Sequence, residues 1–118
     1  KDKRVEVIYD DGRKWLNKHK GGKYDLILAN TTWHWRAYST NILSKEFQTL
    51  VKSVMHKDSI YYYNSTVSSD AYKTSSVVFP YVYKHNFMVL ASGSPVVVDK
   101  VAMKIRLCGR PSAAPANL

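Results

Sequence analysis

The chain has 118 residues, enough for one modest domain with a core of its own. Hydrophobic residues make up 45% and charged residues 23%, as in an ordinary globular protein, and the single cysteine excludes an internal disulfide or a cysteine-based zinc cluster. The net charge of +9 favours anionic partners or a solvated basic face, but no run of five basic residues occurs, so nucleic acid is an unfavoured partner.

The first third of the chain alternates strand and helix patterns. Residues 4–9 are rich in β-branched side chains and predict a strand, which the Asp-Asp-Gly turn at residues 10–12 ends. Residues 13–19 predict a short helix with Trp15 and Leu16 on its apolar face, closed by two glycines. Residues 26–29 are a short apolar run typical of a buried strand, and residues 31–41 predict a loop.

The remaining elements follow at short intervals. Ser44 is a predicted N-cap, and the apolar spacing after it extends the expected helix to Met55, with a turn at residues 57–58. We also expect strands over 59–64, 81–84, 87–91 and 96–98, and helices over 68–76 and 99–107. This alternation predicts an α/β fold with crossover connections, a mostly parallel sheet and flanking helices.

The ends of the chain set its expected domain organisation. Residues 109–118 are rich in Pro and Ala and predict a flexible tail, which leaves residues 1–108 as the folded unit. No apolar stretch approaches the ~20 residues of a membrane span, and a strand pattern begins almost at Lys1. We therefore expect a soluble, cytoplasmic fragment of a longer protein, with unpaired sheet edges available for self-association; a parent with membrane segments elsewhere is compatible with this.

Two segments carry a resemblance to a known family. The run VEVIYDDGRKWL resembles the strand, acidic-glycine turn and helix of spermidine synthase-like aminopropyltransferases, and KYDLILAN resembles their YDVIxxD strand. The stretches from Asn30 to Phe47 and from Ser65 to Pro95 resemble a divergent branch that is often fused to membrane segments. The resemblance implies the C-terminal half of a Rossmann-like, class I methyltransferase-type fold, without the family's glycine-rich cofactor loop.

The resemblance gives Asp11 and Gly12 a cofactor role. In the family, the acidic residue of this turn accepts a hydrogen bond from the adenine of decarboxylated S-adenosylmethionine, and a glycine lets the backbone approach the base. The cofactor implied here is that compound or S-adenosylmethionine, and the partner of the full-length protein is a small nucleoside ligand. The alternative is that Asp11 only forms a turn or caps the following helix.

Asn30 follows the strand at residues 26–29, at the position of the family's catalytic aspartate. A polar residue at the carboxyl end of a buried strand is a candidate site residue, but an amide cannot take a proton as a carboxylate can. Trp33 stands where the family has a second acid. The sequence therefore disfavours polyamine synthesis in this fragment, and His34 is the candidate for a base in place of the missing carboxylate.

The segment Trp33-His34-Trp35-Arg36 is the candidate substrate loop. Its aromatic rings and Arg36 can stack on a base or form a cation–π clamp, or the loop can fold its aromatic side chains onto the sheet edge. No histidines share a metal-ligand spacing, so no metal is expected. Three functions remain open: an aminopropyltransferase- or methyltransferase-like domain, a non-catalytic binding or scaffold domain derived from that fold, and, last, a basic nucleic-acid-binding module.

Overall fold

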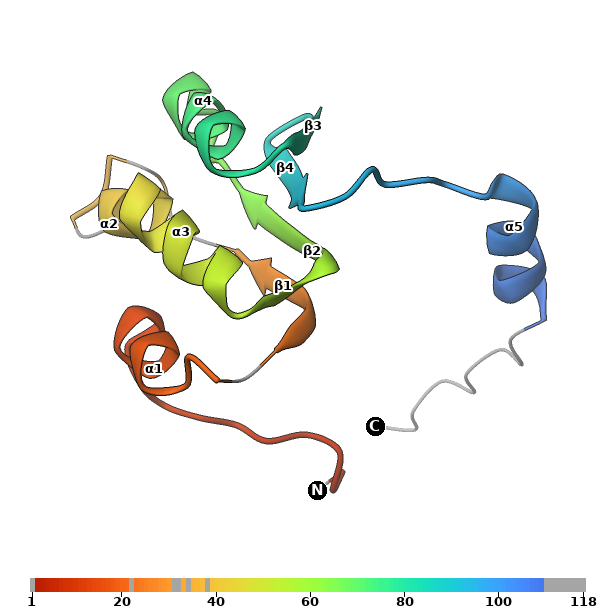
Figure 1. Cartoon of the computed structure of the whole chain (residues 1–118), viewed down its shortest axis with the longest axis horizontal. Helices are drawn as coiled ribbons and strands as arrows, with labels where there is room; N and C mark the ends of the chain where they lie inside the picture. The colour runs from red at the N-terminus through yellow and green to blue at the C-terminus, as the bar shows by residue number, and fades with distance from the viewer. Residues whose placement is uncertain (1, 22, 31–32, 34, 38, 110–118) are drawn as a thin grey trace, which may run out of the picture.

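The computed structural model describes residues 2–21, 23–30, 33, 35–37 and 39–109 (Figure 1). In chain order the helices and strands are α1 (Gly12–Lys18), β1 (Tyr24–Ala29), α2 (Ser39–Leu43), α3 (Lys45–Ser53), β2 (Met55–Asn64), α4 (Ser69–Val78), β3 (Tyr81–His85), β4 (Met88–Ser92) and α5 (Lys100–Cys108). The expected α/β alternation is confirmed.

The four strands form one mixed sheet in the order β1-β2-β4-β3. β1 pairs with β2 in parallel, whereas β4 pairs in antiparallel fashion with both β2 and β3. The prediction of a mostly parallel sheet is therefore wrong. β3 and β4 are joined by a two-residue connection in which Asn86 has a φ of 54°, and so short a connection permits only a hairpin.

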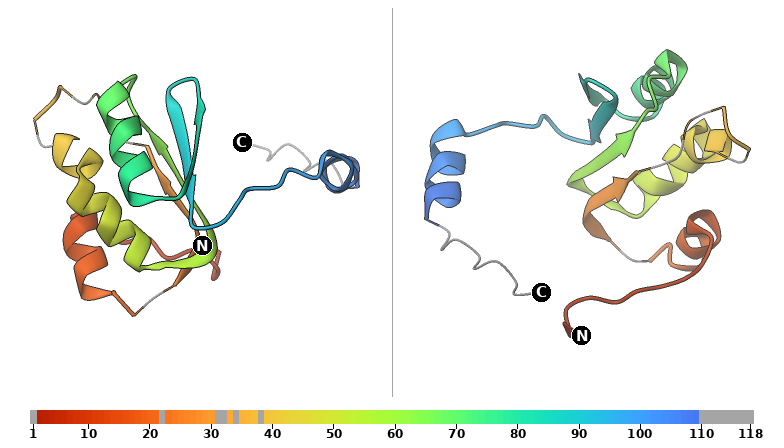
Figure 2. Two further views of the ribbon diagram at one scale, coloured as in Figure 1. Left: turned by 45° about the horizontal axis from the view of Figure 1, so that its top comes forward. Right: turned by 180° about the vertical axis from the view of Figure 1, so that it is seen from behind.

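One face of the sheet is covered and the other is open. Figure 2 shows α1, α3 and α4 in a layer on one side of the strands, and the contacts among α1, α3, α4 and the sheet agree with this view. The core lies between the two layers and contains Leu16, Leu43, Phe47, Val51, Val54, Met55, Tyr61, Tyr63, Ala71, Phe79, Val89 and Ala91. Tyr62 points to the opposite face from Tyr61 and Tyr63, as the strand period predicts.

A buried polar network ties β2 to the helix layer. Tyr63 Oη donates to the carbonyl oxygen of Ala71 at 2.9 Å and lies 2.6 Å from Ser75 Oγ. Ser75 Oγ donates to Gln48 Oε1 at 2.7 Å, and Gln48 Nε2 donates to the Leu43 carbonyl at 3.2 Å. The network joins α3, α4 and β2 through hydrogen bonds that satisfy fully buried side chains.

Five predicted local features differ in the structure. The predicted loop over residues 31–41 contains the start of a helix, because α2 begins at Ser39. Residues 4–9 belong to no strand of the described sheet, and Arg4 lies in a turn in which the Val5 N–H donates to the Asp2 carbonyl at 3.1 Å. Residues 57–58 belong to β2 and form no turn, and the helix after Ser44 ends at Ser53 because β2 begins at Met55. Residues 96–98 form no strand, and these three valines pair with neither of the edge strands β1 and β3.

The C-terminal helix α5 stands apart from the other helices and the sheet (Figures 1 and 2). Asp99 caps it, with Oδ1 accepting from the backbone N–H groups of Val101 and Ala102. Cys108, at the end of this helix, is exposed because the helix packs against no other layer. Within the described residues, no helix has the length and apolar character needed to cross a bilayer. The predicted tail, apart from Gly109, lies outside the described residues.

Candidate functional site

A pocket of about 510 Å³ lies where the carboxyl end of β1 meets the amino-terminal end of α1. Its walls come from the extended amino-terminal segment, the first turn of α1, the last residues of β1, and α2 and α3. The residues that line it are Glu6, Ile8, Asp10, Asp11, Gly12, Arg13, Trp15, Leu16, Ile27, Leu28, Ala29, Asn30, Ile42 and Phe47. The pocket thus has an apolar floor, with three carboxylates, the Arg13 guanidinium and one amide at its rim.

Asp11 is fixed at the pocket by its role as the N-cap of α1. Its Oδ1 accepts from the backbone N–H groups of Arg13 at 2.9 Å and Lys14 at 3.1 Å. The Lys14 N–H is the main reason that the pKa of the Asp11 carboxyl lies below its usual value, and Arg13 adds to the effect. The capping reading of the sequence is therefore confirmed. Oδ2 forms an ion pair with Arg13 Nη2 at 3.6 Å, and the Asp11 side chain is 52% exposed, so a ligand's donor can reach the carboxyl.

Asn30 lies at the same pocket, immediately after β1. Its Oδ1 accepts a hydrogen bond from Asn64 Nδ2 at 3.1 Å, which connects the carboxyl ends of the parallel strands β1 and β2. This hydrogen bond orients the amide, because it assigns Oδ1 to β2 and leaves the Asn30 amino group as the donor toward solvent or a ligand. The structure therefore brings the predicted residues Asp11, Gly12 and Asn30 to one pocket.

The predicted substrate loop is not part of that pocket in the described portion of the chain. Trp33 and Trp35 stack with ring centroids 6.1 Å apart and an interplanar angle of 12°, and the Arg36 guanidinium lies 5.9 Å from the Trp35 ring. Both rings are largely exposed, at 51% and 67%. The rings therefore stack on each other rather than folding onto the sheet edge. His34 lies outside the described residues.

Sequence reasoning missed the apolar floor and one acid of the pocket. Trp15, Ile42 and Phe47 come from three different helices, and no local pattern indicates that they share a pocket floor. Glu6 lies in the segment expected to be a strand, and its placement beside Asp10 and Asp11 depends on the path of that segment. The tight spacing of Glu6, Asp10 and Asp11 in an otherwise basic chain was the available signal.

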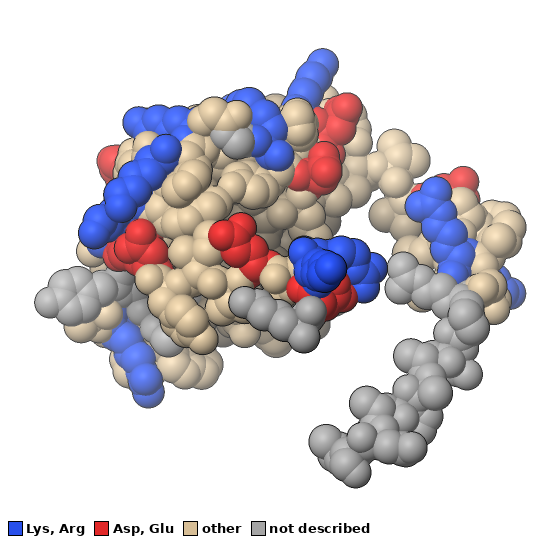
Figure 3. Space-filling view, turned by 90° about the horizontal axis from the view of Figure 1, so that it is seen from below, with Lys and Arg blue, Asp and Glu red and all other residues tan. Residues whose placement is uncertain are grey.

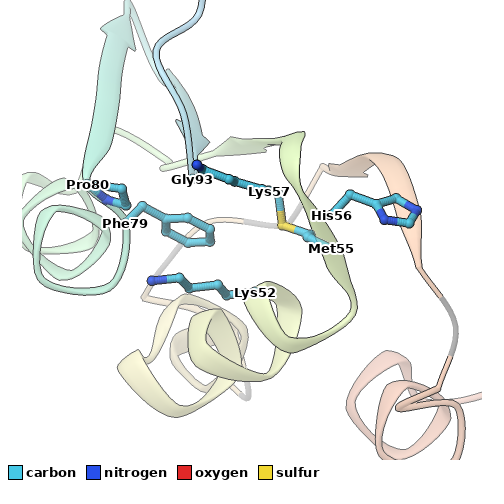
Figure 4. Close-up of a pocket in the computed structure, with 7 residues that line it drawn as sticks. All are labelled: Lys52, Met55, His56, Lys57, Phe79, Pro80 and Gly93. Atoms are coloured by element: carbon cyan, nitrogen blue, oxygen red, sulfur yellow. The ribbon is translucent and has the colours of Figure 1, made fainter.

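A second pocket, of about 250 Å³, lies at the start of β2 (Figure 4). Lys52 reaches beneath the Phe79 ring, with Nζ 5.7 Å from the ring centroid, and donates to the Val78 carbonyl at 2.6 Å. His56 points away from Phe79 and Pro80 in Figure 4. The lysine is thus held by the protein's own groups, and nothing in this pocket points to a ligand.

The strand order and the pocket allow a comparison with known structures. The crystal structure of human methyltransferase-like protein 13 in complex with SAH superposes on this chain with a TM-score of 0.71 and 15% sequence identity. The chain has the fold of part of a methyltransferase. The match covers 97% of this chain and 64% of the human chain. No protein-family model matches the sequence, and the curated proteins contain no significant relative.

The similarity to part of a methyltransferase confirms the expected Rossmann-like fold class, with a sheet that is mixed rather than mostly parallel. Identity of 15% shows the fold alone, so the narrower resemblance to spermidine synthase-like proteins stays a prediction. In the described ranges, no group of three or more His, Cys, Asp or Glu residues is arranged to hold a metal ion.

Proposed function

We propose that this chain supplies part of the binding site for an adenosyl cofactor, either S-adenosylmethionine or its decarboxylated form. The observation that carries the proposal is the pocket that gathers Asp11, Gly12 and Asn30 in a fold similar to that of a SAH-bound methyltransferase. The proposal covers binding; the acceptor substrate and a catalysed reaction are not part of it.

The chemistry of the pocket fits such a ligand. The Trp15 ring and the apolar side chains Ile27 and Phe47 give an adenine ring a surface to pack on. Asp11 Oδ2 is suited to accept from an exocyclic amine, and the acids at the rim favour the positive charge of a sulfonium group. Both ligands carry that sulfonium group and differ in whether the tail keeps its carboxylate. Which of the two binds better therefore depends on the groups that contact the tail.

Titration calorimetry with S-adenosylmethionine and, separately, decarboxylated S-adenosylmethionine tests the proposal. Asp11→Asn keeps an N-cap, because Asn caps helices as well as Asp does, but removes the negative charge. We expect this variant to bind at least tenfold more weakly than the unchanged chain. Asp99→Asn makes the same change at the cap of α5, far from the pocket, and is expected to bind normally. No heat with either compound, or equal losses in both variants, would contradict the proposal.

A specific observation also favours a binding domain without catalysis. Asn30 and Asn64 are hydrogen-bonded amides at the strand ends, and neither can act as a base. We therefore infer that any reaction requires a proton acceptor other than these two residues. Product formation, from decarboxylated S-adenosylmethionine and a polyamine or from S-adenosylmethionine and a methyl acceptor, that Asp11→Ala abolishes would show that the non-catalytic alternative is wrong.

Charge distribution gives the nucleic-acid alternative little support. On the face shown in Figure 3, Lys and Arg side chains lie among Asp and Glu side chains and do not form one continuous basic patch. Binding to phosphates must weaken as salt rises. A salt-sensitive shift with DNA or RNA at low ionic strength would restore that alternative.

A further inference from the structure

The turn that follows β2 has a strained backbone and lies at the same end of the sheet as Asn30. Thr66 and Val67 have φ angles of 53° and 67°, in the left-handed region that residues other than glycine rarely adopt. Val67 is branched at Cβ, and such residues are the least suited to this region. Backbone strain of this kind persists only where the surrounding contacts hold it, and it is concentrated at functional sites.

Hydrogen bonds hold this turn from both sides. The backbone N–H and the hydroxyl of Ser65 both donate to the carbonyl oxygen of Phe87 at 2.8 Å, which fastens the turn to the connection between β3 and β4. The N–H of Ser68 donates to the Ser65 carbonyl at 2.9 Å. The N–H of Thr66 donates to Asn64 Oδ1 at 2.8 Å, a bond that asparagine side chains often make to the backbone two residues on. The direction of the Thr66 N–H is therefore fixed.

The bond from Thr66 decides which way the side-chain amide of Asn64 faces. A backbone N–H can only donate, so the atom that it meets must be the Asn64 oxygen. The Asn64 amino group is then left to donate to Asn30 Oδ1, at 3.1 Å. Asn30 in turn keeps its own amino group as the donor at the pocket rim. Through two amides in series, the direction of one backbone N–H sets the hydrogen-bonding character of this part of the rim.

We propose that Asn64 is a positioning residue, which holds Asn30 so that this part of the pocket binds a hydrogen-bond acceptor of the ligand. The inference rests on the proposed adenosyl cofactor as that ligand. An amide amino group only donates, and so does the ammonium group in the tail of either compound. Asn30 is therefore suited to a hydroxyl oxygen of the ribose or to the carboxylate of S-adenosylmethionine, and unsuited to the ammonium group.

Asn64→Asp tests the proposal because it keeps one hydrogen bond and reverses the other. The new carboxylate still accepts from the Thr66 N–H, so the turn stays in place, but it cannot donate to Asn30 Oδ1. The Asn30 amide is then expected to rotate, so that its amino group donates to the carboxylate and its oxygen faces the pocket. NMR of the side-chain amides, with no ligand present, should show that the Asn30 amino protons exchange with water more slowly than in the unchanged chain.

Calorimetry then measures what this reversal does to binding. We expect Asn64→Asp to weaken cofactor binding about threefold to tenfold, the range that the net value of one hydrogen bond gives. Equal losses for S-adenosylmethionine and its decarboxylated form would place the acceptor in the shared nucleoside, whereas a loss confined to S-adenosylmethionine would identify its carboxylate. Asn86→Asp is the matched control and should bind like the unchanged chain. It adds the same charge at the same end of the sheet, and Asp tolerates the φ of 54° at that position.

Several results would overturn the proposal. They are Asn30 amide exchange that does not slow in Asn64→Asp, unchanged affinity for both compounds, an equal loss in Asn86→Asp, and a loss confined to the decarboxylated compound. If Asn64→Asp does not fold, the unchanged chain decides. The Asn64 amino protons should exchange more slowly than those of Asn30, and the reverse order would overturn the proposal. An unchanged chain that binds neither compound would contradict the proposed function and the ligand assignment, whereas amide exchange separately decides whether Asn64 positions Asn30.

Discussion

Replacing Tyr61 or Tyr63 with phenylalanine removes the same hydroxyl group, but we expect the two replacements to have opposite effects on stability. Both side chains are fully buried on the helix-covered face of β2, and their rings stack with centroids 4.8 Å apart. Tyr63 Oη belongs to the network with Ala71 and Ser75. Among the described residues, Tyr61 Oη is the one buried side-chain polar atom that has no hydrogen-bond partner.

The magnitudes follow from this difference. Tyr63→Phe removes a satisfied hydroxyl, and the net value of a typical hydrogen bond predicts a loss of about 1 kcal/mol in the free energy of unfolding. Ser75 retains Gln48 as its acceptor, which limits the loss. Tyr61→Phe removes an unpaired buried hydroxyl, whose desolvation penalty of about 1–3 kcal/mol is then relieved. We expect a gain of about 1 kcal/mol, taking the low end of that penalty because relaxation recovers part of it.

Urea unfolding measures the contrast directly. With an m-value of about 1–2 kcal/mol/M, a difference of about 2 kcal/mol separates the midpoints of the two variants by roughly 1–2 M. Both hydroxyls stay neutral at neutral pH, because burial raises the pKa of Tyr61 and of Tyr63 above the usual value. Equal destabilisation of the two variants would show that Tyr61 Oη has a partner, such as a bound water, and would refute the reasoning.

Further predictions concern the second pocket and the two aspartate caps. Gly93→Ala places a Cβ 2.7 Å from the carbonyl oxygen of Lys57, so β2 or β4 must shift and thermal unfolding should show a loss of about 1–3 kcal/mol. Asp11 has a lowered pKa in the folded chain, chiefly through the Lys14 N–H, so its stabilising contribution is complete above about pH 4 and is lost as pH falls through the folded pKa. Urea midpoints measured between pH 2 and 6 should therefore fall less steeply with acid in Asp11→Asn than in the unchanged chain; identical slopes would contradict this. Asp99→Ala removes the α5 cap, and circular dichroism should show less helix while the main unfolding midpoint stays fixed, because α5 packs against no other layer.

Local patterns in the sequence predicted most helices and strands. Ser44 is an N-cap as expected, the helix expected over residues 68–76 is α4, and the apolar runs around residues 26–29, 59–64 and 87–91 are strands. These features depend on side chains a few residues apart. The pairing direction depends on distant backbone groups, so the antiparallel position of β4 between β2 and β3 was not predictable from its own residues. Residues 4–9 have strand composition without a strand partner, which composition alone does not reveal.

The site was predictable only where its residues lie at the ends of elements that local sequence patterns predict. Asp11, Gly12 and Asn30 follow or precede regular elements, and parallel α/β packing brings such ends together. The aromatic and apolar floor was not predictable, because Trp15, Ile42 and Phe47 meet only once α1, α2 and α3 are packed. The exposure of the Trp33 and Trp35 rings was likewise unpredictable from residue type, since aromatic side chains in a loop are equally compatible with burial.

The position of β4 in the sheet has a consequence for the order of folding. β4 is the last strand in the chain, yet it lies between β2 and β3 and pairs with both, as in Ile60 with Ser92 and Tyr81 with Ser92. A chain growing from its amino terminus can therefore form the β1–β2 pair early, but it cannot attach β3 to the sheet until Ser92 has been synthesised. Until then the inner edge of β2 is exposed, which makes the nascent chain most vulnerable to aggregation just before its last strand arrives.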